Sequence, residues 1–178
     1  RMTDMGIYSD IANRTGGDIY IGVVGPVRTG KSTFIKRFME TLVIPYAKES
    51  ERAMMVDELP QSAAGKTIMT TEPKFIPNEA VEISVGNSAS FNIRMIDCVG
   101  YIVSEALGTI ENGQPRMVNT PWQDEPMPFV EAAEMGTEKV IKEHSTIGML
   151  VTSDGTIGDI SRESYVPAEE RIVTELKS

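Results

Sequence analysis

Nine consecutive residues near the N-terminus have the types and spacing of a phosphate-binding loop. They are Gly25, Pro26, Val27, Arg28, Thr29, Gly30, Lys31, Ser32 and Thr33. The first eight match the pattern G-x-x-x-x-G-K-[ST], in which the glycines let backbone N–H groups wrap around phosphates. The N-terminus of a following helix adds positive potential. The pattern predicts that Lys31 contacts the β and γ phosphates of a nucleotide and that Ser32 binds Mg²⁺.

A second short motif follows an apolar stretch further along the chain. Asp97 and Gly100 stand in the spacing D-x-x-G directly after residues 91–96. In phosphate-binding enzymes such a carboxylate holds Mg²⁺ through water, and the glycine N–H contacts the γ-phosphate. An isolated D-x-x-G also fits a strand that ends in a turn. Together with the loop at Gly25, it indicates the metal side of a nucleotide site.

Thr67, Thr70 and Thr71 stand close together between these motifs, and Thr70 and Thr71 are the candidate ligands. Switch-type nucleotidases supply a hydroxyl to Mg²⁺ and the γ-phosphate from this part of the chain. Threonine is also favoured in strands for its shape alone. The residues by themselves therefore leave both roles open, as a metal ligand or as part of a strand.

Arg28 and Tyr101 bear on how water would be activated. Tyr101 stands where Ras-like enzymes carry a water-orienting Gln, and a tyrosine cannot act in the same way. Arg28 is a long cation within the phosphate loop, so it is a candidate for stabilising charge on the transferred phosphoryl group. The alternatives are an arginine in solvent and one paired with a carboxylate of another subunit.

A strand and a helix flank the loop, as phosphate binding requires. Residues 19–24 form a short apolar run rich in β-branched side chains, which predicts a buried parallel strand ending at Gly25. From Lys31 onward, apolar residues recur at helical spacing until Pro45 ends the pattern. These apolar residues are Phe34, Ile35, Phe38, Met39 and Leu42. We therefore predict a helix with one face on a sheet.

The rest of the chain alternates in the same way. Predicted strands are 68–76, 81–85, 91–96 and 147–151, and predicted helices are 48–57, 129–144 and 168–176. The turn signal at 86–88 predicts an antiparallel hairpin beside the first strand, and the strand at 147–151 is apolar enough to be buried. Residues 60–65 favour a mobile loop, and 100–128 favour a long ordered insertion or lid. The order predicts one α/β domain over residues 1–178, with a mixed sheet flanked by helices.

Composition narrows the classes of partner. The 178 residues carry 17 basic and 26 acidic side chains, a net charge of −9, so the field of the protein repels nucleic acids and anionic lipids. Cys98 and His144 are the only residues of their types, which excludes an internal disulfide and a Cys/His zinc cluster. No signal sequence or long apolar stretch is visible, so we expect a cytoplasmic protein without direct membrane insertion. The helical pattern runs to the end without a stop signal, which favours a piece of a longer protein.

Four blocks outside these motifs carry a specific resemblance. They are residues 57–75 (DELPQSAAGKTIMTTEPKF), 14–20 (RTGGDIY), 119–122 (NTPW) and 143–148 (EHSTIG). With them, the chain resembles the N-terminal nucleotidase domain of the stage IV sporulation protein A family. The resemblance implies a P-loop domain related to translation-factor-type (TRAFAC-like) GTPases that uses ATP and Mg²⁺. It also implies that Lys31 is the P-loop lysine, Asp97 the metal-side aspartate, and Thr70 and Thr71 the γ-phosphate-sensing threonines.

The resemblance further implies what the reaction is for. In this family, ATP hydrolysis drives self-assembly of a layer beneath the spore coat, on the forespore surface in the mother-cell cytoplasm. Expected partners are other copies of the protein, coat proteins and a small amphipathic membrane-anchoring protein, bound through regions absent from this chain. Two alternatives stay open. One is a GTPase of the ribosome-assembly or translation type, whose guanine-reading N/T-K-x-D motif would lie beyond Ser178. The other is a module that binds nucleotide without hydrolysing it, which Tyr101 favours.

Overall fold

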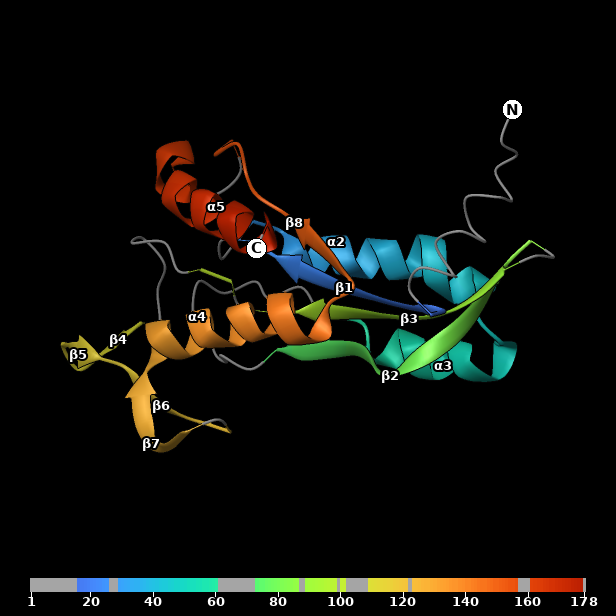
Figure 1. The fold of residues 1–178 in the computed structure, drawn as a ribbon, viewed down its shortest axis with the longest axis horizontal. Coiled ribbons are helices and arrows are strands. Elements are labelled where there is room, and N and C mark those ends of the chain that lie inside the picture. The colour runs from blue at the N-terminus through green and yellow to red at the C-terminus, as the bar shows by residue number, and fades with distance from the viewer. Residues whose placement is uncertain are drawn as a thin grey trace.

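A mixed four-stranded sheet forms the centre of the protein. The computed structural model describes residues 16–25, 29–60, 73–86, 89–98, 100–101, 109–121, 123–156 and 161–177. The sheet has the order β2-β3-β1-β8, with β1 at Asp18–Val24, β2 at Lys74–Val85, β3 at Ala89–Asp97 and β8 at Ile147–Leu150 (Figure 1). β1 pairs in parallel with β3 and β8, and β2 pairs antiparallel with β3. This confirms the predicted hairpin beside the first strand.

Helices cover both faces of this sheet. Helix α2 (Lys31–Phe38) continues as the π-helix η1 (Met39–Val43) and the 3₁₀ turn η2 (Ile44–Tyr46), and α3 follows at Glu49–Asp57. Helix α4 (Phe129–Lys139) continues as the π-helix η3 (Val140–His144), and α5 spans Arg162–Lys177. Within the described ranges, no helix is both long and apolar enough to cross a membrane.

Alternate residues of the strands face two separate cores. Ile21 and Val23 of β1 are buried on the face that α2, η1 and α3 cover. The next residue, Val24, is buried on the opposite face, against Val140 of η3 and Ile172 of α5. This two-sided burial of β1 explains why its sequence is a continuous apolar run rather than an alternating one.

The first helix departs from the predicted apolar stripe at its end. Leu42 was predicted to face the sheet, but it is 50 % exposed, whereas Val43 is fully buried. The cause is η1, because a π-helical turn bonds residue i to residue i+5 and changes which side chains point inward. Val43 therefore occupies the place in the core that the α-helical spacing assigned to Leu42.

Other boundaries also differ from the prediction. Residues 74–76 of the expected strand 68–76 and the expected strand 81–85 belong to one strand, β2, with a register shift between Ile76 and Val81. Residues 61–72 lie outside the described part. β8 forms as expected but is not buried: Ile147 is 41 % exposed because β8 lies at the end of the strand order. α5 begins six residues before the predicted start and contains Pro167.

Short hairpins occupy the described part of the predicted insertion. β4 (Ile110–Glu111) pairs with β5 (Gln114–Pro115), and β6 (Met117–Thr120) pairs with β7 (Gln123–Pro128). Both hairpins project at one end of the molecule, beside the start of α4 (Figure 1). The Phe129 N–H donates to the Arg116 carbonyl at 2.7 Å and so ties these hairpins to α4.

Candidate functional site

Lys31 lies at the point where β1 gives way to α2. Gly30 caps the helix in a left-handed conformation, with φ of 85°, and Lys31 is the first residue of α2. The Lys31 side chain is only 7 % exposed, and its Nζ donates to the Gly25 carbonyl at 3.4 Å. The lysine therefore folds back over the start of the predicted phosphate loop, at the carboxyl end of a parallel strand, which is where α/β sheets bind ligands.

The second motif meets the first at the same edge of the sheet. Asp97 ends β3 and is paired in register with Val23 of β1. The Ser32 hydroxyl donates to the Asp97 carboxylate (Oδ2) at 3.1 Å. The structure thus brings together the two side chains predicted to bind Mg²⁺ from either side. Hydroxyl and carboxylate oxygens are the ligands that Mg²⁺ prefers.

Gly25 and Gly100 pack so closely that neither position has room for a side chain. Gly100 has φ of +83°, and a Cβ added there would lie 1.6 Å from the Gly25 carbonyl oxygen and 3.4 Å from Lys31 Nζ. A Cβ added at Gly25 would lie 2.0 Å from the Val151 carbonyl oxygen. Three backbone segments therefore converge around Lys31. A cradle of bare backbone suits phosphate, because N–H groups can approach it closely.

Burial shifts the pKa of both charged groups toward the neutral form. It lowers the pKa of Lys31, an effect that Cys98 and Asp97 oppose. Burial likewise raises the pKa of Asp97, while Lys31, the hydrogen bond from Ser32 and Lys74 oppose that shift. Burial thus makes the charged form of each side chain less favourable than it is in water. A phosphate beside Lys31 and a divalent cation beside Asp97 would favour the charged forms.

Lys74 is a cation near this site that the motifs do not reveal. It is the first residue of β2 and is paired directly with Asp97 across the strands, so both side chains project from the same face of the sheet. Lys74 is exposed, and its positive charge opposes the rise that burial causes in the pKa of Asp97. Its place three residues after Thr71 was the only signal in the sequence.

Tyr101 does not occupy a water-orienting position; it is part of the core. Its side chain is 2 % exposed and lies in the cluster formed by Val24, Val140 and Ile172. The Arg171 guanidinium lies over the ring, 4.4 Å from its centroid. Burial, opposed by Arg171, raises the pKa of Tyr101 to about 12. The packing of Tyr101 gives a physical reason why this residue would not replace the water-orienting Gln of Ras-like enzymes.

Several predicted site residues cannot be placed in this geometry. Pro26, Val27, Arg28, Thr70 and Thr71 lie outside the described residues, so their roles stay predictions. Of the remaining loop positions, Thr29 is half-buried before Gly30, and Thr33 is exposed on α2.

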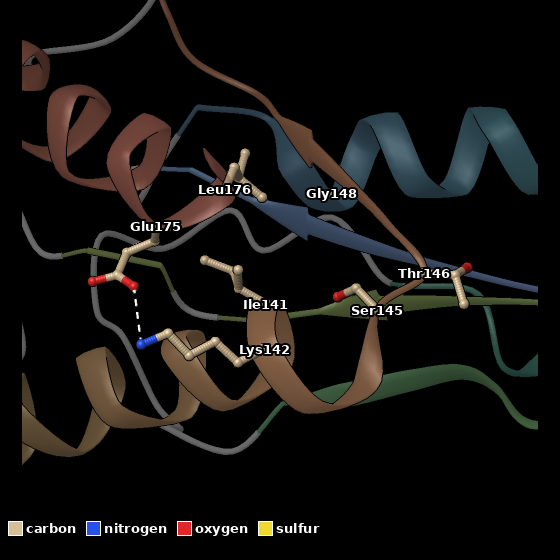
Figure 2. Close-up of a pocket in the computed structure, with 7 residues that line it drawn as sticks. All are labelled: Ile141, Lys142, Ser145, Thr146, Gly148, Glu175 and Leu176. Carbon is tan, nitrogen blue, oxygen red and sulfur yellow. Dashed lines mark ion pairs between the residues drawn. The ribbon is translucent and has the colours of Figure 1, made fainter. Parts of the chain in front are cut away.

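A cavity of about 560 Å³ lies elsewhere, between η3, β8 and α5 (Figure 2). Ile141 and Leu176 contribute apolar surface to it, and Lys142 forms an ion pair with Glu175 at 3.5 Å along its side. Of the predicted site residues that the structure describes, none lines this cavity. Lys31, Ser32, Asp97 and Gly100 lie instead at the loop edge of the sheet.

Comparisons with known proteins show which family the chain belongs to. Residues 2–178 match the model of the family described as stage IV sporulation protein A, ATPase domain. The chain is 63 % identical over 177 residues to stage IV sporulation protein A of Bacillus subtilis (strain 168), covering 99 % of this chain and 36 % of that protein. The protein of the same name from Bacillus anthracis is 64 % identical, with the same coverage. That from Clostridioides difficile (strain 630) is 60 % identical over 173 residues, covering 97 % of this chain and 35 % of the relative. The chain spans about a third of the length of these curated relatives. It belongs to the stage IV sporulation protein A family and is the ATPase domain of that family.

Proposed function

We propose that this domain binds ATP with Mg²⁺ at the loop that begins at Gly25 and hydrolyses it to ADP and phosphate. The observation that carries the proposal is the meeting of Lys31, the Ser32–Asp97 hydrogen bond and the Gly25–Gly100 contact at one edge of the sheet. The family's designation as an ATPase domain supports the choice of nucleotide. The parallel β3-β1-β8 core with antiparallel β2 supports the translation-factor-type (TRAFAC-like) class of P-loop domain.

Each described residue has a part in this proposal. Lys31 would leave the Gly25 carbonyl and bind the β and γ phosphates, and Ser32 and Asp97 would hold Mg²⁺. The Gly100 N–H would donate to the γ-phosphate. Bound Mg²⁺ neutralises charge that develops on the phosphates. Thr70 and Thr71 are the proposed sensors of the γ-phosphate, and Arg28 the proposed cation for charge on the transferred group.

The biological role proposed for the whole protein goes beyond this domain. We propose that the hydrolysis cycle drives self-assembly of the layer beneath the spore coat, on the forespore surface in the mother-cell cytoplasm. The names of the relatives, which refer to sporulation, support this setting. The contacts with other copies, with coat proteins and with a membrane-anchoring partner are proposed to belong to regions that this chain does not include.

The decisive experiment compares two alanine substitutions in α2, one at a lysine and one at an arginine. Lys31→Ala should abolish Mg²⁺-dependent release of phosphate from ATP, because it removes the buried cation that faces the phosphates. Arg37→Ala is the matched control, because its side chain is 80 % exposed on the same helix and should leave turnover unchanged. Wild-type ATP turnover in a folded Lys31→Ala protein would reject the proposal.

Two further measurements address the rival functions. ATP and GTP affinities measured side by side would identify a GTPase by tighter binding of GTP. Burial of Tyr101 favours the second rival, a module that binds without hydrolysing, because the usual water-orienting position is taken by a core residue. Release of phosphate under single-turnover conditions would exclude that rival, and bound ATP that persists unchanged would establish it.

A further inference from the structure

Tyr101 links the phosphate edge of the sheet to the helices on the opposite face. It directly follows Gly100, whose backbone is pressed against the Gly25 carbonyl beside Lys31. The tyrosine ring, by contrast, is buried against Ala168 and Ile172 of α5. One peptide bond thus separates a residue in the proposed nucleotide site from a residue in the second core.

An ion pair between α5 and α4 lies beside the Tyr101 ring. Arg171 of α5 donates to Glu134 of α4 at 2.8 Å, and its guanidinium lies 4.4 Å from the centroid of Tyr101. The Arg171 side chain is 48 % exposed and that of Glu134 is 27 % exposed. The ring is therefore held between the apolar cluster on one side and a cation fixed by a carboxylate on the other. A cation over an aromatic face is attractive, and the ion pair keeps Arg171 in that place.

The Tyr101 hydroxyl adds no hydrogen bond from the described residues to this arrangement. It is buried and has no hydrogen-bond partner among the residues that the structure describes. A buried hydroxyl without a partner is normally unfavourable, so the ring rather than the hydroxyl accounts for the position of Tyr101. Phenylalanine should hold the same place.

From these contacts we infer that Tyr101 is a positioning residue: clamped by Arg171 and Glu134, its ring holds Gly100 against Gly25 and so sets how tightly the site distinguishes ATP from ADP. A glycine with positive φ has wide conformational freedom, and its N–H can serve the γ-phosphate only if its position is fixed from outside. The buried neighbour supplies that restraint. The inference rests on the proposed function, because it concerns the γ-phosphate.

The test compares the affinities of Mg²⁺ complexes of a non-hydrolysable ATP analogue and of ADP. Arg171→Ala should weaken binding of the analogue about tenfold, equal to about 1.4 kcal/mol, and change ADP affinity by less than about twofold. Arg171→Lys, which keeps a cation over the ring, should recover part of the loss. Glu134→Ala should act in the same direction as Arg171→Ala, because it removes the carboxylate that holds the guanidinium in place. Tyr101→Phe should discriminate the two nucleotides as the wild type does.

Lys139→Ala is the matched control. It removes a cation from α4 whose ion-pair partner is Glu143, at 3.6 Å, so both affinities should stay at the wild-type value. Equal loss of both nucleotides in Arg171→Ala would overturn the inference, since it would show a general structural role. An unchanged ratio of affinities would overturn it too, as would loss of discrimination in Tyr101→Phe. If the wild type bound neither nucleotide, the proposed function would fail first, which separates the two ideas.

Discussion

Lys31 and Asp97 are charged side chains in surroundings that favour their neutral forms. The same burial lowers the pKa of the lysine and raises that of the aspartate. Neither shift stabilises the folded protein by itself, because burial makes the charged form of each side chain less favourable than the neutral form. Residues of this kind are typical of functional sites, where stability is given up for chemistry.

This cost predicts a pH-dependent effect of Asp97→Asn. A raised pKa means that the folded state binds the proton more tightly than the unfolded chain does. Stability therefore falls as pH rises from the ordinary carboxyl pKa, about 4, through the raised value, and it stays lower above that window. Without metal, Asp97→Asn should be more stable than the wild type at pH 7.5, and the difference should disappear near pH 4. Urea unfolding at both pH values measures this, and a less stable variant at pH 7.5 would contradict it.

Gly100→Ala should damage both the site and the fold. The substitution adds the strain of a left-handed backbone, about 1 to 2 kcal/mol, to a Cβ placed 1.6 Å from the Gly25 carbonyl oxygen. We expect loss of ATP turnover and a melting temperature lower by more than about 5 °C. Gly113→Ala is the control, because Gly113 has φ of +76° with no atom within 4 Å of the added Cβ. It should show only the backbone strain, and equal effects of the two substitutions would argue against the close contact.

At the residue scale, local motifs in the sequence were enough to predict which groups lie together in the candidate site. The spacing around Lys31, Ser32, Asp97 and Gly100 predicted a shared site, and the structure brings these four together. It could not reveal Lys74, because its relation to Asp97 is set by strand register rather than by distance along the chain. The packing of Tyr101 under Arg171 was also hidden, since 70 residues of chain separate the two.

At the scale of elements, the turn of π-helix after α2 decides which side chain enters the core. Val43→Ala should lower the free energy of unfolding by about 2 kcal/mol, because a fully buried side chain is truncated. Leu42→Ala, at the neighbouring and 50 % exposed position, should change it by less than about 0.5 kcal/mol. Urea unfolding of both variants tests which of the two side chains points into the core. The reverse order of effects would restore the uninterrupted α-helix that the spacing predicts.

Helix α5 shows why element boundaries were harder to predict than element types. The predicted helix begins at Ala168, directly after Pro167. In the structure the helix begins at Arg162. Arg162 forms two hydrogen bonds with Glu169, at 2.6 and 2.8 Å, across the turns on either side of the proline. That contact between side chains seven residues apart is not visible to helix-start rules based on single positions.

For the whole molecule, the two cores explain why the site lies where it does. α2 and α3 pack on one face of the sheet, η3 and α5 pack on the other, and β1 is buried between them. The carboxyl end of β1 is thus a place where both cores end together, with Lys31 contributed from one side and Tyr101 from the other. Alternation of apolar segments predicted the α/β order, but the assignment of helices to faces depends on contacts that no local pattern encodes.

The burial of Cys98 has a practical consequence. Its Sγ donates to the Val23 carbonyl at 3.4 Å, and burial raises its pKa to about 11. At neutral pH such a thiol is almost entirely protonated and shielded, so alkylating reagents reach it only in molecules whose sheet edge has opened. Because Cys98 is the only cysteine of this chain and adjoins Asp97, its rate of alkylation measures how often the proposed nucleotide site opens. The chain carries this reporter in its own sequence, so no further reporter group has to be introduced.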